Sequence, residues 1–367
     1  MKQVCLLCER TSPDNNLYCQ ETYCPAEMSP TILDYGEWMG DVEIVKPVMI
    51  LRSGVLYEAT HQKKKVFLKV AHPGEENKER LKREAEFLAG IQLNKEQNEF
   101  LPVLLPPYAN TTIKDDAYGK TMLRGHLLYF CLFEFAEGEP LRDVLTDNPQ
   151  LWINHAGWLM ISLATAVNFM HIKGLFHYAI SPDAVLVRFY ETEGKFDAPG
   201  ILLFDLGIVS DAQNVRQDWY SFAGLPAYTA PELLNGRAFQ PAYAADVYGL
   251  GLTLYEMLVG EPAFTYKLHS DEEVYEAIER NRRIRMNRVE DVKSIANIAL
   301  QATNPQIQSR QPDAAVFAQQ LAAYFGQVPA PKRSRWPSLH TIMVVVIILL
   351  TVAFLIALAV SLNEFAA

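Results

Sequence analysis

The chain has 367 residues, of which half are apolar and 21% are charged, so it is long enough for one large globular domain with additions. Its formal net charge of -10 argues against a nucleic-acid-binding protein, because the surface of such a protein is usually basic. No low-complexity run or internal repeat stands out.

The N-terminal segment holds four of the five cysteines, in the pairs Cys5-x-x-Cys8 and Cys19-x4-Cys24. Zinc prefers four soft ligands in tetrahedral geometry, and two cysteine pairs separated by a short polar loop can supply them. Two disulfides are the alternative, but the segment lacks the basic start and apolar run of a secretory signal. It resembles small zinc ribbons attached to bacterial signalling proteins. We therefore expect residues 1–28 to bind a structural zinc ion and to offer a docking surface.

Strand-like runs and then helical patterns follow a linker at residues 29–41. The runs VEIVKPVMI, VLYEAT and KVFLKVA are rich in β-branched and aromatic residues and are separated by turn residues. The charged run EENKERLKREAEFLAGIQ has the apolar periodicity of a helix, and helical periodicity dominates after Gly138. The sequence predicts an α+β domain at residues 42–326, with a small β-rich lobe at 42–135 and a larger helical lobe at 136–326.

The C-terminal part of the sequence predicts a transmembrane helix at residues 341–362. This run contains no charged side chain and would be about 30 Å long as a helix. A buried core helix is the alternative, but it would rarely be this long and apolar all round. The Pro-rich linker at residues 327–340 contains the basic residues Lys332, Arg333 and Arg335. Because the basic flank normally stays in the cytoplasm, we expect a single-pass membrane protein with a cytoplasmic main body and a short tail at 363–367.

Several short motifs in the small lobe occur in the order and spacing found in protein kinases. VFLKV resembles the third strand with its nucleotide-binding lysine, here Lys69, and REAEFL resembles the helix that supplies the partner glutamate, here Glu84. FCLFEFAEGEPL resembles the hinge between the lobes, with Phe133 at the gatekeeper position. The resemblance would place Glu134 and Ala136 beside a bound nucleotide.

The large lobe continues the same series of motifs. LFHYAISPDAVLV resembles the catalytic loop, and LLFDLGIV resembles the metal-binding turn, with Asp205 as a magnesium ligand. AGLPAYTAPELL resembles the end of the activation segment, and DVYGLGLTLYEMLVGEPAF resembles the central helix. The resemblance covers roughly residues 42–326 and implies a two-lobed protein-kinase-like fold with a site for ATP and magnesium.

The residues that perform phosphoryl transfer in this family are replaced here. Transfer depends on positioning and on charge neutralisation. Ala179 stands in place of the catalytic aspartate, Ser181 in place of the phosphate-neutralising lysine, and Ala184 in place of the second metal ligand. The expected glycine-rich loop, MILRSGVLYEAT, keeps Gly54 alone, so bulky side chains hinder backbone contact with phosphates. Asp183 precedes Ala184 and is expected to point elsewhere.

Other retained residues resemble the groups that keep the kinase fold together. Glu232 and Arg310 resemble a buried ion pair of the large lobe. Asp246 opens an apolar helical run, so we expect it to cap that helix, and its family counterpart braces the catalytic loop. His177 is interpreted in the same structural sense. Tyr178 replaces the arginine that answers phosphorylation of the activation segment, so we expect no switch of that kind.

Lys69, Glu84 and Asp205 allow two interpretations. They could hold the phosphates and a magnesium ion, or the lysine–glutamate pair could simply fix the small lobe. The leading hypothesis is a membrane-anchored cytoplasmic pseudokinase that regulates or scaffolds protein partners, with or without bound ATP. One alternative is an atypical serine/threonine kinase with weak activity. A further alternative is an interaction module whose pocket is filled by its own side chains, as bulky Leu51 and Arg52 would favour.

Overall fold

In the computed structural model of the chain, the described residues are 3–4, 11–12, 33–72, 74–96, 98–123, 125–148, 152–188, 191–192, 195–196, 200–213, 225–234, 242–265, 271–280, 284–286 and 293–326. The chain divides into two units, Met1–Pro329 and Ala330–Ala367, and the second lies outside these residues. The predicted transmembrane run at 341–362 therefore lies outside them too, as do the cysteines of the predicted zinc ribbon, Cys5, Cys8, Cys19 and Cys24. None of the described helices is long and apolar enough to cross a membrane.

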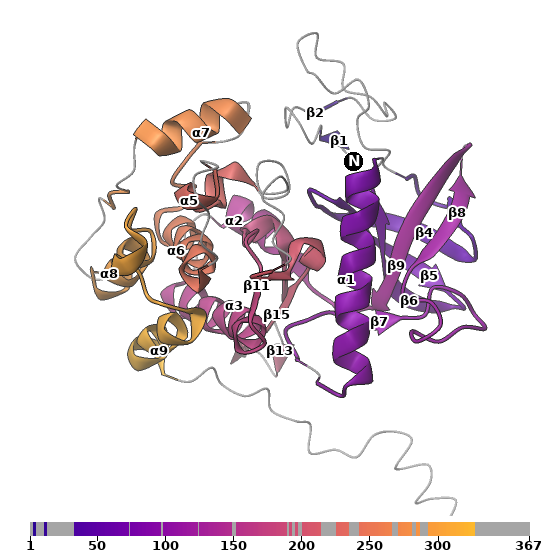
Figure 1. Cartoon of the computed structure of the whole chain (residues 1–367). Coiled ribbons are helices and arrows are strands. Elements are labelled where there is room, and N and C mark those ends of the chain that lie inside the picture. Colours follow the sequence, from indigo (N-terminus) through magenta and orange to yellow (C-terminus); the bar gives the residue numbers. More distant parts are fainter. Residues whose placement is uncertain are drawn as a thin grey trace, which may run out of the picture. The chain divides into compact units, whose positions relative to one another are not determined.

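The small lobe is a curled antiparallel sheet of seven strands, with the order β3-β4-β5-β6-β9-β7 and with β8 paired to β9 (Figure 1). The strands are β3 (Trp38–Met39), β4 (Val42–Ile50), β5 (Gly54–His61), β6 (Lys64–Ala71), β7 (Leu104–Leu105), β8 (Gly119–Leu123) and β9 (His126–Glu134). The β5–β6 hairpin turns at Gln62 and Lys63, which both have positive φ, as a two-residue turn requires. Gly54 is needed where it lies, because a Cβ there would be 2.2 Å from the Val70 carbonyl oxygen.

Helix α1 (Glu75–Leu93) packs its apolar face against this sheet and carries charged residues on the other side. Leu81, Ala85 and Leu88 are all buried in a core that also contains Phe67 and Cys131. The helical periodicity of this run therefore predicted the buried face correctly, and the three predicted strand runs are confirmed as β4, β5 and β6.

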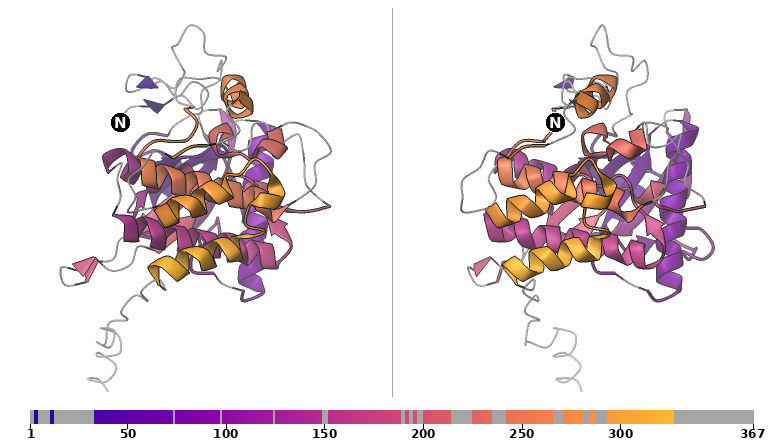
Figure 2. Two further views of the ribbon diagram at one scale, coloured as in Figure 1. Left: turned by 90° about the vertical axis from the view of Figure 1, so that its left-hand side faces the viewer. Right: turned by 60° about the vertical axis from the view of Figure 1, so that its left-hand side comes forward.

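The large lobe is mainly helical. Its helices are α2 (Leu141–Asp147), α3 (Ile153–Ile172), α5 (Pro231–Leu234), α6 (Tyr243–Val259), α7 (Asp271–Arg280), α8 (Lys293–Ala302) and α9 (Ala314–Phe325), with the 3-10 turns η1 (Pro182–Ala184), η2 (Leu206–Ile208), η3 (Pro226–Tyr228) and η5 (Ile307–Ser309). In Figure 2, α9 (yellow) runs beside α3 (magenta), and these two helices contact one another.

Short strands complete the fold. Strands β10 (Glu139–Pro140), β12 (Val185–Arg188) and β15 (Gly200–Leu203) form one sheet, and β11 (Leu175–Phe176) pairs with β16 (Ser210–Asp211). Two further pairs are β1 (Gln3–Val4) with β2 (Thr11–Ser12), and β13 (Glu191–Thr192) with β14 (Lys195–Phe196). Strands β12 and β15 bring the ends of the catalytic loop and of the metal-binding turn together, because Phe204 donates its backbone N–H to the Ala184 carbonyl at 2.8 Å.

The expectation that Asp246 caps its helix is wrong. Helix α6 begins at Tyr243, and Ala242 occupies the cap position, so Asp246 lies in the first turn. Its carboxylate is buried and faces the catalytic loop instead. The sequence pattern misplaced the start because the residues before Asp246 extend the helix by one turn under tertiary packing.

Candidate functional site

The structure brings together the three retained residues that the sequence singled out. Lys69 on β6 forms an ion pair with Glu84 on α1, and its Nζ lies 3.0 Å from Asp205 Oδ1. All three side chains are buried. Burial alone would lower the pKa of Lys69, but the carboxylates of Asp205 and Glu84 raise it above its ordinary value. Lys69 therefore remains a cation between two carboxylates.

Two further residues, which the sequence did not point out, complete this cluster. The Ser53 hydroxyl donates a hydrogen bond to Asp205 Oδ1, and Arg80 Nη2 on α1 lies 3.2 Å from Asp205 Oδ2. Both side chains are buried. Arg80 precedes Glu84 by one helical turn, so both side chains lie on the same face of α1. This spacing could have predicted that Arg80 lies near the site. Ser53 gave no such signal, because its partner lies far away in the sequence.

Asp205 is thus engaged at both carboxylate oxygens. Burial alone would raise its pKa, but the positive charges of Lys69 and Arg80 and the Ser53 hydroxyl hold the pKa of Asp205 well below its ordinary value. Its backbone is left-handed, with φ at 62° and ψ at 45°, which is a strained conformation for a residue other than glycine. We call Ser53, Lys69, Arg80, Glu84 and Asp205 the charged cluster.

The turn at residues 51–53, between β4 and β5, folds into the core above the charged cluster. Leu51 is buried, as is Met49 before it. His72 holds the turn at two points: its Nε2 donates to the Leu51 carbonyl at 2.9 Å, and its backbone N–H donates to the Ser53 carbonyl at 3.0 Å. Burial lowers the pKa of His72 to about 4. In the family, this segment covers the phosphates of a nucleotide, whereas here its own side chains occupy the interior.

The catalytic loop is braced but lacks its reactive groups. Asp246 accepts backbone hydrogen bonds from His177 at 2.9 Å and from Tyr178 at 2.5 Å. The Tyr178 ring stacks on Phe176, with ring centroids 5.0 Å apart, and its hydroxyl accepts from the Ala242 backbone N–H. The braced backbone therefore presents only a methyl group at position 179.

Asp183, the acidic residue of the catalytic loop, is paired with Arg142. Its two carboxylate oxygens accept hydrogen bonds from Arg142 on α2, at 3.2 and 2.8 Å. Arg142 also bonds Glu256 on α6 and the Tyr228 hydroxyl. Asp183 therefore ties the loop to two helices of the large lobe.

The predicted buried pair of the large lobe is present. Arg310 and Glu232 form two parallel hydrogen bonds, of 2.6 and 2.9 Å, and Arg310 also donates to the backbone carbonyls of Ala244 and Asn304. The Arg310 side chain is fully buried. This pair holds the segment after η3 to the end of the domain.

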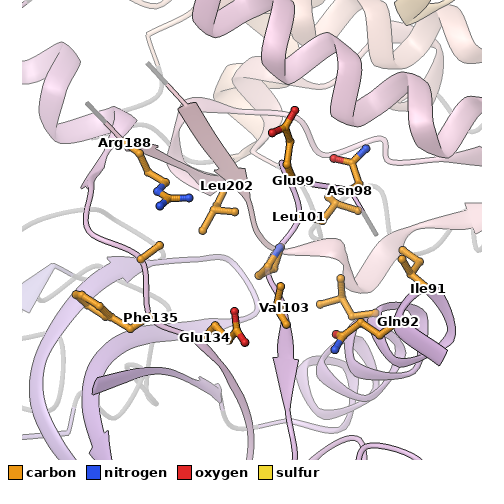
Figure 3. A pocket seen from close by; sticks show the side chains of 13 residues that line it. Ile91, Gln92, Asn98, Glu99, Leu101, Val103, Glu134, Phe135, Arg188 and Leu202 are labelled. Atoms are coloured by element: carbon orange, nitrogen blue, oxygen red, sulfur yellow. The ribbon is translucent and has the colours of Figure 1, made fainter. Parts of the chain in front are cut away.

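The two predicted hinge contacts line a hollow that no residue of the charged cluster lines. The side chains of Glu134 and Ala136 line a hollow of about 390 Å³, together with Val103, Arg188 and Leu202 (Figure 3). Neither Lys69 nor Asp205 lines this hollow. The gatekeeper position, Phe133, is buried and packs edge-on against Phe204, with ring centroids 5.8 Å apart.

A curled antiparallel sheet with a buried lysine–glutamate pair, joined to a helical lobe with a braced loop, defines the protein-kinase-like class of fold. The sequence model that represents the protein kinase domain family matches residues 52–324 of this chain. The chain therefore belongs to the protein kinase family.

Three curated relatives illustrate the similarity. The chain is 32% identical over 143 residues to the serine/threonine-protein kinase PkaA of Streptomyces coelicolor and 31% identical over 135 residues to the atypical protein kinase C of Drosophila melanogaster. It is 26% identical over 136 residues to the calcium/calmodulin-dependent protein kinase type II subunit delta of Oryctolagus cuniculus. The matches cover 39%, 37% and 37% of this chain, but only 25%, 21% and 24% of the relatives.

Family membership suggests ATP and magnesium as ligands, but the residues at Asp205 do not fit a magnesium ion. Magnesium needs free carboxylate oxygens, and both oxygens of Asp205 are engaged by the charged cluster. Ala184 offers no oxygen ligand from its side chain. Over the described part of the chain, no group of three or more His, Cys, Asp or Glu side chains could hold a metal ion.

Proposed function

We propose that this chain is a regulatory or scaffolding pseudokinase, whose kinase fold binds protein partners and does not transfer phosphate. The observation that carries the proposal is the closure of the charged cluster. Asp205 is neutralised by Lys69 and Arg80 and receives the Ser53 hydroxyl, so the cluster is complete without nucleotide or metal.

The catalytic loop supports the same proposal. Phosphoryl transfer needs a group that orients the attacking hydroxyl and accepts its proton, and an alanine side chain can do neither. The nearest acidic residue in the sequence, Asp183, is committed to Arg142. The brace at Asp246 is nevertheless intact, so the domain keeps a defined surface for partners.

The proposal includes membrane anchoring through residues 341–362, with the kinase-like domain on the cytoplasmic side. It also includes a zinc ribbon held by Cys5, Cys8, Cys19 and Cys24, which would serve as a docking surface for a protein partner. The support is in the sequence: an uncharged run of membrane-spanning length and two cysteine pairs. Metal analysis of the purified full chain should find stoichiometric zinc that a strong chelator removes.

The test is a phosphotransfer assay with the purified full chain, labelled ATP and magnesium. The proposal predicts no transfer to itself or to a general protein substrate above the level given by the Asp205→Asn variant. Circular dichroism would show that the variant remains folded. Transfer that the wild type performs and the folded variant does not would overturn the proposal, whereas equal transfer by both would indicate a contaminating kinase.

An atypical, weakly active serine/threonine kinase is the second candidate. The observation that favours it is the intact Lys69–Glu84 pair beside a left-handed Asp205, as in a site arranged for phosphates. Activity would require Ser53 and Arg80 to leave Asp205 before a metal ion binds. The same assay decides between the candidates, because only this one predicts transfer that depends on Asp205.

A further inference from the structure

The first turns of α3 present a cluster of aromatic side chains at the surface of the large lobe. Trp152, directly before the helix, is 56% exposed. Its ring contacts His155 and Trp158 edge-on, with centroid distances of 4.7 and 5.9 Å. Burial lowers the pKa of His155, so its ring is neutral at physiological pH. The cluster is therefore aromatic and uncharged.

The last turn of α9 extends this cluster. The Phe325 ring packs on Gly157 of α3 so closely that a Cβ at Gly157 would be 2.3 Å from it. Tyr324, 49% exposed, lies beside Phe325 with ring centroids 4.9 Å apart. The start of α3 and the end of α9 are thus in contact. We call Trp152, His155, Trp158, Tyr324 and Phe325 the aromatic face.

The composition of these two helices distinguishes the aromatic face from other exposed apolar residues. Neither α3 nor α9 contains a single Asp, Glu, Lys or Arg, although 21% of the chain is charged. Trp38 in the small lobe is 54% exposed, but it lies next to Glu37 and near Asp41. Exposed aromatics that stand singly are ordinary, whereas an aromatic surface on two uncharged helices suggests a partner.

The position of the aromatic face in the chain indicates the partner. Helix α9 ends at Phe325, and the linker at residues 327–340 leads from there to the predicted transmembrane run. Because this linker is Pro-rich, it spans about 40 Å when extended and reaches about 50 Å at most. The aromatic face, which lies where the linker begins, is therefore kept near the membrane. A weak contact suffices when a short tether keeps the local concentration high.

We propose that the aromatic face lies in the headgroup region of the lipid bilayer, so that the large lobe rests on the membrane instead of hanging free from its linker. The inference rests on the membrane anchoring proposed above. Tryptophan and tyrosine prefer this region because their rings are apolar and their N–H and O–H groups remain hydrated. Because α3 and α9 contain no charged residue, neither helix would bring a charge close to the acyl chains, which is energetically costly.

The test uses the full chain in phosphatidylcholine vesicles made with or without brominated acyl chains, which quench nearby tryptophan emission. Replacing Trp152 by Phe should remove part of the bromine-dependent quenching. The matched control, Trp38→Phe, removes a tryptophan of similar exposure from the small lobe and should leave that quenching unchanged. In the converse pair, Tyr324→Trp should add quenched emission and Tyr35→Trp should not, although Tyr35 is 79% exposed.

The outcomes separate this inference from the proposed function. If the chain floats with the vesicles, but neither Trp152 nor an indole at position 324 is quenched, the aromatic face does not touch lipid and only this inference is overturned. Equal quenching at positions 35 and 324 would also overturn it, because the contact would not belong to this face. If the chain does not float with vesicles at all, membrane anchoring itself fails.

Discussion

The charged cluster and the catalytic loop belong to the same expected site, and they have changed in opposite ways. In the cluster, the ionisable groups of the family are retained and Ser53 and Arg80 add to them, so each charge has a buried partner. In the loop, the reactive side chains have been replaced by small, uncharged ones at Ala179 and Ala184.

The difference separates groups that support the fold from groups that serve only the reaction. Lys69, Glu84 and Asp205 join strand, helix and loop, so losing one of them would leave an unpaired charge in the interior. The family's catalytic aspartate serves the reaction, and its loss at position 179 leaves the hydrogen bonds to Asp246 in place. Under the proposed function, residues that hold the fold are kept and residues that serve only the reaction are replaced. The following predictions test this contrast.

The largest effect is expected at the buried pair of the large lobe. Arg310→Ala would leave Glu232 without its partner, and breaking such a pair costs about 3–5 kcal/mol of unfolding free energy. The control is Arg280→Ala, which removes an exposed pair with Glu276 and should cost less than about 1 kcal/mol. Urea unfolding of the full chain in detergent measures both. Equal losses would show that the buried pair does not hold the fold.

A smaller effect is expected from opening the charged cluster. Ser53→Ala removes one hydrogen bond to the Asp205 carboxylate, and a hydrogen bond to a charged group contributes about 1.5–3 kcal/mol. Ser309→Ala, at an exposed serine, should change the unfolding free energy by less than about 0.5 kcal/mol. Equal losses of unfolding free energy in the Ser53→Ala and Ser309→Ala variants would contradict this account of the cluster.

An effect of similar size is a pH dependence at His72, whose folded pKa is about 4 and whose unfolded pKa is about 6.5. Between these values the unfolded chain binds a proton that the folded chain does not, so the stabilisation is complete above about pH 6.5 and is lost toward pH 4. At pH 5 the loss relative to pH 7 is about 2 kcal/mol.

His72→Gln keeps a donor for the Leu51 carbonyl but removes the titrating ring. The difference in unfolding midpoint between the variant and the wild type should therefore shift in favour of the variant as the pH falls from 7 to 5. His155 and His177, whose pKa values burial also lowers, contribute equally to both proteins. A difference that stays constant with pH would show that His72 is not the buried neutral group described here.

The sequence predicted the fold and part of the site for identifiable reasons. Local patterns located the strands and the buried face of α1, and the resemblance to kinases brought Lys69, Glu84 and Asp205 together correctly. The sequence could not predict that Ser53 contacts Asp205, because that contact depends on how a turn in the small lobe packs against the large lobe. The position of Arg80 could have been predicted from its spacing of one helical turn from Glu84, but no family motif pointed to this residue.

Other parts of the predicted site and of the predicted domain organisation stay predictions. The resemblance places Glu134 and Ala136 beside a bound nucleotide. Both residues line a hollow together with Arg188 and Leu202, and their contact with a nucleotide stays a prediction. The zinc ribbon and the transmembrane helix lie outside the described residues and stay predictions.

The most direct test of the central claim is the melting temperature of the full chain with and without millimolar Mg-ATP, compared with magnesium alone. Any ligand that binds only the folded state raises the melting temperature by mass action. We expect no rise beyond that seen with magnesium, because the charged cluster is complete without a nucleotide. A rise that grows with the concentration of Mg-ATP would show that the site still opens to its nucleotide and would contradict the account.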